Sequence, residues 1–105
     1  MFLRLCSIEE ISPGEMRQFY LQGEEILVVN LEGRIYCLDA RCSHAGAPLA
    51  EGSLQGEMLT CPWHYSQFRI TDGSVLRGPA TNPLRVYRTE IRDGQLFVDL
   101  LAPEI

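Results

Sequence analysis

Two short cysteine-histidine pairs carry the clearest chemistry in this sequence. Cys42 and His44 form the first pair, and Cys61 and His64 form the second. Together they use both histidines of the chain and half of its four cysteines. Thiolate sulfur and imidazole nitrogen are good metal ligands, so the economical interpretation is a metal centre with two ligands of each kind. Such a set suits either a tetrahedral zinc ion or a 2Fe-2S cluster with both histidines on one iron.

The order of the ligands helps to separate these two interpretations. A familiar zinc finger places its cysteine pair first and its histidine pair afterwards. Here Cys-Ser-His at 42–44 and Cys-Pro-Trp-His at 61–64 each supply one cysteine and one histidine, in the same order. Two similar loops that face each other can give one cysteine each to an inner iron and one histidine each to an outer iron. The order therefore favours the cluster, and zinc remains the alternative.

In these residues the chain resembles the Rieske-type iron-sulfur proteins, specifically the small soluble Rieske ferredoxins. A further segment, Gly78-Pro79-Ala80, is similar to the proline loop that covers the cluster in that family. The resemblance implies one 2Fe-2S cluster per chain, held by Cys42, His44, Cys61 and His64. It also implies an all-β Rieske fold, in which an antiparallel β-barrel-like base carries a small inserted cluster-binding subdomain.

The resemblance also implies roles for residues around the cluster. Ser66 matches a serine that donates a hydrogen bond to a bridging sulfide, with an incidental exposed hydroxyl as the alternative. Phe68 stands where high-potential respiratory members carry a tyrosine donor. Without that donor the reduced form is less favoured, so we expect a potential toward the low end of the Rieske range, roughly -150 to +300 mV. Trp63 and Pro79 are expected to shield the sulfurs and to form part of an apolar docking surface; simple loop packing is the alternative. Tyr65 departs from the glycine commonly found after the second histidine, and its role stays open.

The rest of the chain must supply the scaffold that positions these loops. Nine glycines and six prolines leave little room for long helices, while short β-branched and aromatic runs fit between the turn signals. An all-β domain is therefore predicted. Its strands are predicted over residues 2–6, 16–21, 25–31, 34–39, 57–61, 67–70, 84–92 and 95–100. Asp93-Gly94 predicts a tight hairpin between the last two strands, and Ser7 predicts a capping box before one helical turn.

Length and composition predict a single domain. With 105 residues, 46% of them hydrophobic, the chain has material for one modest core. Residues 1–39 and 84–105 are expected to form the base, and residues 40–83 the cluster-binding subdomain. The other two cysteines, Cys6 and Cys37, fall on predicted strands and are interpreted as buried free thiols. A disulfide between them is the alternative, disfavoured in a reducing compartment.

Charge and hydropathy narrow the cellular setting. The longest aliphatic run, residues 26–29, is far shorter than the roughly 18 residues of a membrane span. Arg4 interrupts the apolar start of the chain, so no signal peptide is predicted and a cytoplasmic location is expected. The net charge of -5 disfavours nonspecific binding to nucleic acid or to anionic membranes. It allows electrostatic steering toward a basic patch on a partner.

The expected function follows from a lone cluster. Related ring oxygenases need a separate mononuclear iron, usually held by two histidines and a carboxylate, and both histidines here are already committed. Ala47 and Trp63 stand where respiratory members carry the cysteines of a disulfide. We therefore expect an electron-transfer protein and not an enzyme: a carrier from a flavin-dependent NAD(P)H reductase to a terminal aromatic-ring oxygenase. The alternatives are a small Rieske-like subunit beside the large subunit of a nitrite reductase and, in another class, a zinc-stabilised interaction module.

Overall fold

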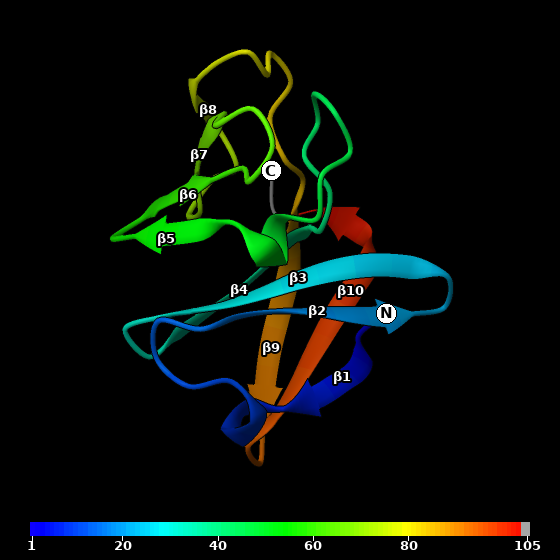
Figure 1. Cartoon of the computed structure of the whole chain (residues 1–105). Helices are drawn as coiled ribbons and strands as arrows, with labels where there is room; N and C mark the ends of the chain where they lie inside the picture. Colours follow the sequence, from blue (N-terminus) through cyan, green and yellow to red (C-terminus); the bar gives the residue numbers. More distant parts are fainter. Residues whose placement is uncertain (104–105) are drawn as a thin grey trace.

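Two antiparallel sheets make up the fold in the computed structural model, which describes residues 1–103 (Figure 1). The larger sheet has the strand order β1-β10-β9-β4-β3-β2 and curves into a barrel-like base. Its strands are β1 (Leu3–Ser7), β2 (Met16–Leu21), β3 (Glu24–Leu31), β4 (Arg34–Asp39), β9 (Val86–Arg92) and β10 (Gln95–Pro103). The smaller sheet has the order β5-β6-β7-β8, with β5 (Ser53–Gln55), β6 (Met58–Thr60), β7 (Gln67–Arg69) and β8 (Val75–Arg77). The predicted all-β Rieske architecture is confirmed, and residues 104–105 of the expected base lie outside the described residues.

Strand β3 lies between two hydrophobic cores. Successive side chains of a strand point to opposite faces, and here both faces are covered. Leu27 and Val29 belong to one buried cluster, while Ile26 and Val28 belong to the other. The apolar run thus forms a central strand because each of its faces has a partner. An apolar run without polar alternation is typical of a strand buried on both faces.

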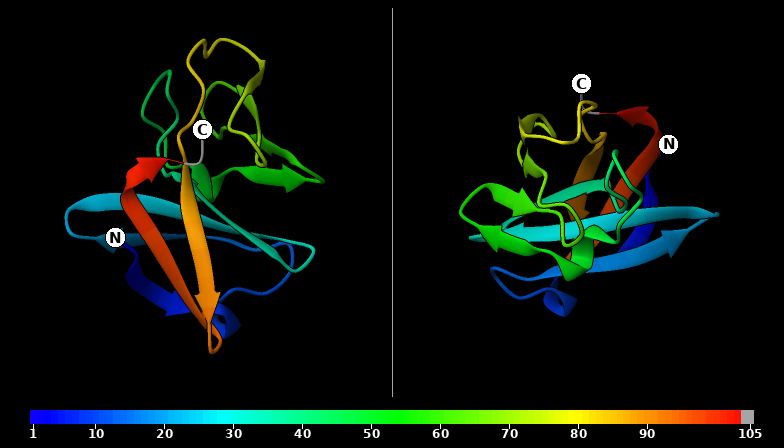
Figure 2. Two further views of the ribbon diagram at one scale, coloured as in Figure 1. Left: turned by 180° about the vertical axis from the view of Figure 1, so that it is seen from behind. Right: turned by 45° about the horizontal axis from the view of Figure 1, so that its top comes forward.

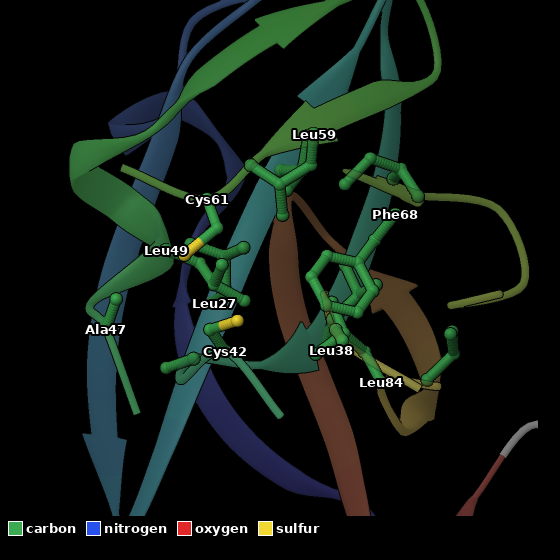
Figure 3. Packing of buried hydrophobic residues seen from close by; sticks show 14 residues of the cluster. Leu27, Leu38, Cys42, Ala47, Leu49, Leu59, Cys61, Phe68 and Leu84 are labelled. Carbon is green, nitrogen blue, oxygen red and sulfur yellow. The ribbon is translucent and has the colours of Figure 1, made fainter. Parts of the chain in front are cut away.

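The core that includes Leu27 joins the two sheets. It contains Leu38 of the base together with Leu59 and Phe68 of the smaller sheet, and all four side chains are fully buried (Figure 3). Burying such side chains contributes about 1.5–3 kcal/mol each relative to leaving them exposed. The smaller sheet is therefore held firmly against the base.

The second core fills the interior of the base. Leu96 and Val98 of β10 are buried in it, and Leu100 packs against it, so these alternate residues share one face of the strand. The β9–β10 hairpin turns at the predicted Asp93-Gly94 dipeptide. Both turn residues have positive φ, as a two-residue type I′ turn requires.

Helical structure among the described residues is limited to two short 3-10 turns, η1 (Ile8–Glu10) and η2 (Leu49–Glu51). The predicted capping box precedes η1: Ser7 Oγ accepts a hydrogen bond from Glu9 N–H, and the Glu10 carboxylate accepts one from Ser7 N–H. Neither turn approaches the length and apolar character that crossing a membrane would demand.

Three loops lie together at the end of the molecule opposite the β9–β10 turn, as the two additional views show (Figure 2). They follow β4, β6 and β8. The sheets thus carry these loops at one end, and the two cysteine-histidine motifs lie on the first two.

Candidate metal centre

The first ligand loop begins at Arg41 and ends at Pro48, where an isolated β-bridge joins the two residues. Inside the loop, the N–H of Cys42 donates a hydrogen bond to the carbonyl of Ala47 at 2.9 Å. Cys42 is buried, whereas His44 is exposed at the turn. The loop therefore sends its sulfur inward and its imidazole toward solvent.

The second ligand loop connects β6 to β7 and repeats this construction. The N–H of Cys61 donates to the carbonyl of Ser66 at 2.8 Å, again the carbonyl of the fifth residue after the cysteine. Cys61 is 1% exposed, and His64 is exposed. Tyr65 follows the histidine with a φ of 63°, in the left-handed region that glycine usually occupies. The two ligand loops thus have equivalent backbone hydrogen bonds and the same arrangement of buried cysteine and exposed histidine.

The side chains of these loops meet in two like pairs. The rings of His44 and His64 have centroids 5.4 Å apart and an interplanar angle of 74°. The side chains of Cys42 and Cys61 lie in the core between the two sheets (Figure 3), close enough for Cys42 to raise the pKa of Cys61. The structure thus brings the two histidines together and the two cysteines together, with sulfur buried and nitrogen exposed, and their joint action as four ligands of one centre stays a prediction.

The surroundings of Cys61 suit a thiolate ligand. Burial raises the pKa of the Cys61 thiol, while the backbone N–H groups of Trp63 and His64 hydrogen-bond to it and act in the opposite direction. Cys42 raises the same pKa further, since two neighbouring thiolates would repel each other. Positive metal ions would remove that repulsion, and backbone donors stabilise charge on a ligating sulfur. This donor set, with buried thiols on one side and solvent-exposed imidazoles on the other, fits a 2Fe-2S cluster.

A third loop, which carries Pro79 after a cis peptide bond, is tied to both ligand loops. The N–H of Ala80 donates to Ser66 Oγ at 2.9 Å, and Ser43 Oγ donates to the carbonyl of Asn82 at 2.6 Å. Nothing in the sequence signals these contacts, because they join residues that lie 14 and 39 positions apart. The third loop therefore fixes how the two ligand loops stand relative to each other.

The remaining predicted site residues divide between the interior and the surface. Ser66 and Phe68 are fully buried: Phe68 belongs to the core cluster that contains Cys42 and Cys61, and the Ser66 carbonyl accepts the hydrogen bond from Cys61 N–H. Pro79 is exposed, and Trp63 is 52% exposed. With half of its indole in solvent, Trp63 contributes apolar surface beside His64 as well as packing.

The other two cysteines take no part in this site. Cys6 and Cys37 are buried in the second core as free thiols, which confirms the prediction made for them. Burial raises the pKa of the Cys6 thiol to about 11, and the nearby Glu10 carboxylate adds to the rise. Burial also raises the pKa of Cys37. Both thiols therefore remain protonated and behave as small apolar side chains.

Comparison with protein families identifies the class. Residues 1–88 match the Rieske [2Fe-2S] domain, so the chain belongs to the Rieske iron-sulfur family. Its cofactor is accordingly a Rieske 2Fe-2S cluster, which sets the zinc alternative aside.

Relatives of nearly the same length narrow the assignment within that family. The chain is 34% identical over 97 residues to the ferredoxin component of biphenyl 2,3-dioxygenase from Rhodococcus jostii strain RHA1, covering 92% of this chain and 91% of that protein. It is 31% identical over 99 residues to ferredoxin CarAc of Metapseudomonas resinovorans, covering 93% and 92% respectively. The resemblance inferred from the motifs is confirmed, and the chain is a Rieske-type ferredoxin.

Solved structures agree with this assignment. The Sphingomonas yanoikuyae B1 ferredoxin superposes with a TM-score of 0.89 at 30% identity, covering 94% of this chain and 98% of that one. A second match, with a TM-score of 0.86 at 30% identity, covers 92% of this chain and 91% of a chain in the complex of reduced oxygenase and oxidized ferredoxin in carbazole 1,9a-dioxygenase.

Proposed function

We propose that this Rieske ferredoxin carries single electrons from a flavin-dependent NAD(P)H reductase to a terminal aromatic-ring oxygenase. The observation that carries the proposal is the exposed imidazole pair, His44 and His64, standing at the molecular surface above the buried thiols. Its relatives are ferredoxin components of dioxygenase systems, and a matching ferredoxin forms a complex with an oxygenase. Those relatives do not favour the alternative of a nitrite reductase subunit.

In this proposal Cys42 and Cys61 bind the inner iron, and His44 and His64 bind the outer iron. The cluster, when bound, supplies reversible one-electron chemistry. The protein's own part is to keep water from the sulfurs through the hydrophobic core and to hold both imidazoles at the surface. The chain thus needs no substrate pocket or catalytic base, and acts as an electron-transfer component rather than an enzyme.

We assign the support of this centre to two parts of the chain. Residues 1–39 and 84–105 serve as the base, and residues 40–83 serve as the cluster-binding subdomain. The separate strand orders of the two sheets support this division. We place the protein in the cytoplasm, where NAD(P)H for such reductases is available, and we assign it no nucleic-acid or membrane partner.

Metal content and spectroscopy test the proposal. Protein purified without oxygen should contain about two irons and two acid-labile sulfides per chain, and reduction should produce an EPR signal. His64→Ala should lose or convert the cluster, since it removes one of the two nitrogen ligands. The reduced protein should pass its electron to an oxygenase component of a dioxygenase system. Colourless protein with one zinc per chain, or an unaltered spectrum in the His64 variant, would exclude the proposed centre.

A further inference from the structure

Tyr65 has a backbone conformation that its side chain does not favour. Four residues other than glycine have positive φ in the described part of the chain: Gln22, Glu32, Tyr65 and Asp93. Three of them are each followed by a glycine and turn the chain between two adjacent strands, where type I′ geometry requires positive φ. Tyr65 is followed by Ser66 and is the only aromatic residue of the four. An aromatic side chain in this region is a genuine outlier.

Local packing does not account for the choice of tyrosine. The side chain is 67% exposed, so little burial offsets the backbone strain. Among residues 1–103, the Tyr65 side chain makes no hydrogen bond and no ring contact. Glycine would satisfy the same backbone without strain. Since neither packing nor backbone geometry requires tyrosine at this position, its exposed ring is the feature to be explained.

The three loops at this end of the molecule contain no charged residue of their own. The two ligand loops and the third loop, defined here as residues 42–50, 61–68 and 78–83, contain no Lys, Arg, Asp or Glu. Trp63, which is 52% exposed, lies on the other side of His64 in the sequence. Along the sequence, the exposed His64 is thus flanked by two exposed aromatic residues, and charge adjoins these loops at their margin, where Arg41 donates to the Gly46 carbonyl and Arg77 pairs with Gln67.

We propose that Tyr65 is a docking residue that sets the affinity of this ferredoxin for its terminal oxygenase. This inference rests on the proposed function, and the oxygenase is its occupant because a ferredoxin of the same fold has been solved in complex with an oxygenase. Exposed tyrosine and tryptophan give large contact areas at low entropic cost, and they dominate the binding energy of many interfaces. The complementary oxygenase surface is therefore expected to be apolar where it contacts Tyr65, without a buried charge, and to lie next to the exposed imidazoles.

Three variants separate docking from folding. Tyr65→Gly removes the ring and relieves the backbone, Tyr65→Phe keeps the ring, and Gln22→Gly relieves the same kind of backbone strain far from the loops. The probes are the purified oxygenase components of carbazole 1,9a-dioxygenase, biphenyl 2,3-dioxygenase and naphthalene 1,2-dioxygenase. Binding is measured by calorimetry, electron transfer by stopped-flow absorbance, and the centre by EPR and redox titration.

Tyr65→Gly should bind the best of the three oxygenases about tenfold more weakly than the wild type. Its melting temperature should equal or exceed that of the wild type, and its EPR signal and potential should not change. Tyr65→Phe and Gln22→Gly should bind as the wild type does. Unchanged affinity in Tyr65→Gly would overturn this inference and leave the proposed function standing. Failure of the wild type to reduce any of the three oxygenases would count against the proposed function, and this inference would fall with it.

Discussion

Ser66 serves two loops with one hydroxyl group. Its oxygen accepts the hydrogen bond from Ala80 N–H, and its side chain is fully buried. A hydroxyl also has a proton to donate, and the accepted bond restricts where that proton points. The role implied by the family, donation to a bridging sulfide, uses this remaining proton. Ser66 thus joins the third loop to the site where negative charge increases on reduction.

Replacing Ser66 by alanine should lower the reduction potential without loss of the cluster. A hydrogen bond to a charged acceptor contributes about 1.5–3 kcal/mol, which for one electron corresponds to roughly 60–130 mV. Redox titration followed by EPR measures the shift. Ser53→Ala, which alters an exposed serine on β5, is the matched control and should leave the potential unchanged. A Ser66 variant with an unshifted or higher potential would exclude the sulfide-donor role.

Phe68→Tyr should change the potential in the opposite direction. Phe68 is fully buried in the core between the sheets, at the position where high-potential members carry a tyrosine donor. A phenol there would stabilise the reduced centre, so we expect a rise of similar size, roughly 60–130 mV. The extra oxygen adds volume to a packed core and should also lower stability by about 1–3 kcal/mol. Destabilised protein with an unchanged potential would show that no hydrogen bond to the centre forms.

At the scale of elements, Asp39 links the two strands between which the cluster-binding segment is inserted. Its carboxylate accepts a hydrogen bond from Arg85 N–H at 2.7 Å and another from the Tyr87 hydroxyl at 3.3 Å. Its own N–H donates to the Arg85 carbonyl at 3.0 Å. These bonds join the end of β4 to the start of β9. The chain therefore leaves and re-enters the base at a fixed point, which keeps the ligand loops on a rigid support.

This junction predicts a sensitivity to alkali. Burial raises the pKa of Tyr87 to about 12 from the ordinary value of 10.0, and the Asp39 carboxylate adds to the rise. The folded state therefore holds the phenol proton more tightly than the unfolded state does. The resulting stability is complete below pH 10 and is lost as the pH rises toward 12.

Tyr87→Phe has no phenol to ionise, so its melting temperature should fall less steeply than that of the wild type between about pH 10 and pH 12. Melting followed by far-UV circular dichroism across this range measures both slopes. Ionisation of the buried thiols Cys6 and Cys37 also lowers the stability of the folded protein at high pH, but it does so equally in the wild type and in the variant. The difference between the two slopes therefore isolates Tyr87. Parallel curves would contradict the assignment.

The longer elements are also those that sequence reasoning predicted well. β2 and β4 have the bounds expected from alternation and turn signals, and the other long strands differ by one to three residues. β5 and β8 were not predicted. Each has three residues, too few for a period-two pattern to stand out, and each is defined by pairing with its neighbour in the small sheet. Such strands depend on tertiary contacts that a local pattern does not contain.

At the scale of the whole molecule, the same limit applies to the site. Residue type was enough to identify the four candidate ligands, because paired cysteines and histidines have few other uses in so small a chain. The bonds of the third loop to Ser43 and Ser66, and the left-handed backbone of Tyr65, depend on how distant segments meet. The family resemblance predicted which loops form the site, and the structure shows which of their atoms are in contact.

The distribution of charge gives the last prediction. The net charge of -5 lies outside the three loops, which carry none, in a molecule 39 Å long. At physiological salt the Debye length is about 8 Å, so acidic groups on the base contribute little to forces at the docking face. Docking through loops that carry no charge, with Arg41 and Arg77 at their margin, should therefore depend only weakly on salt, in contrast to the steering that net charge alone would suggest.

The association rate constant with an oxygenase should change by less than about threefold between about 50 and 300 mM salt, measured by stopped flow. Ala45→Lys, which places one charge in the first ligand loop, should make that dependence distinctly steeper, because the new charge would lie within the contact. The matched variant Arg88→Gln changes an exposed charge on β9 of the base and should behave as the wild type does. A wild-type rate that falls tenfold or more over the same range would show that charges beyond the three loops reach the partner, and the docking surface would then have to include part of the base.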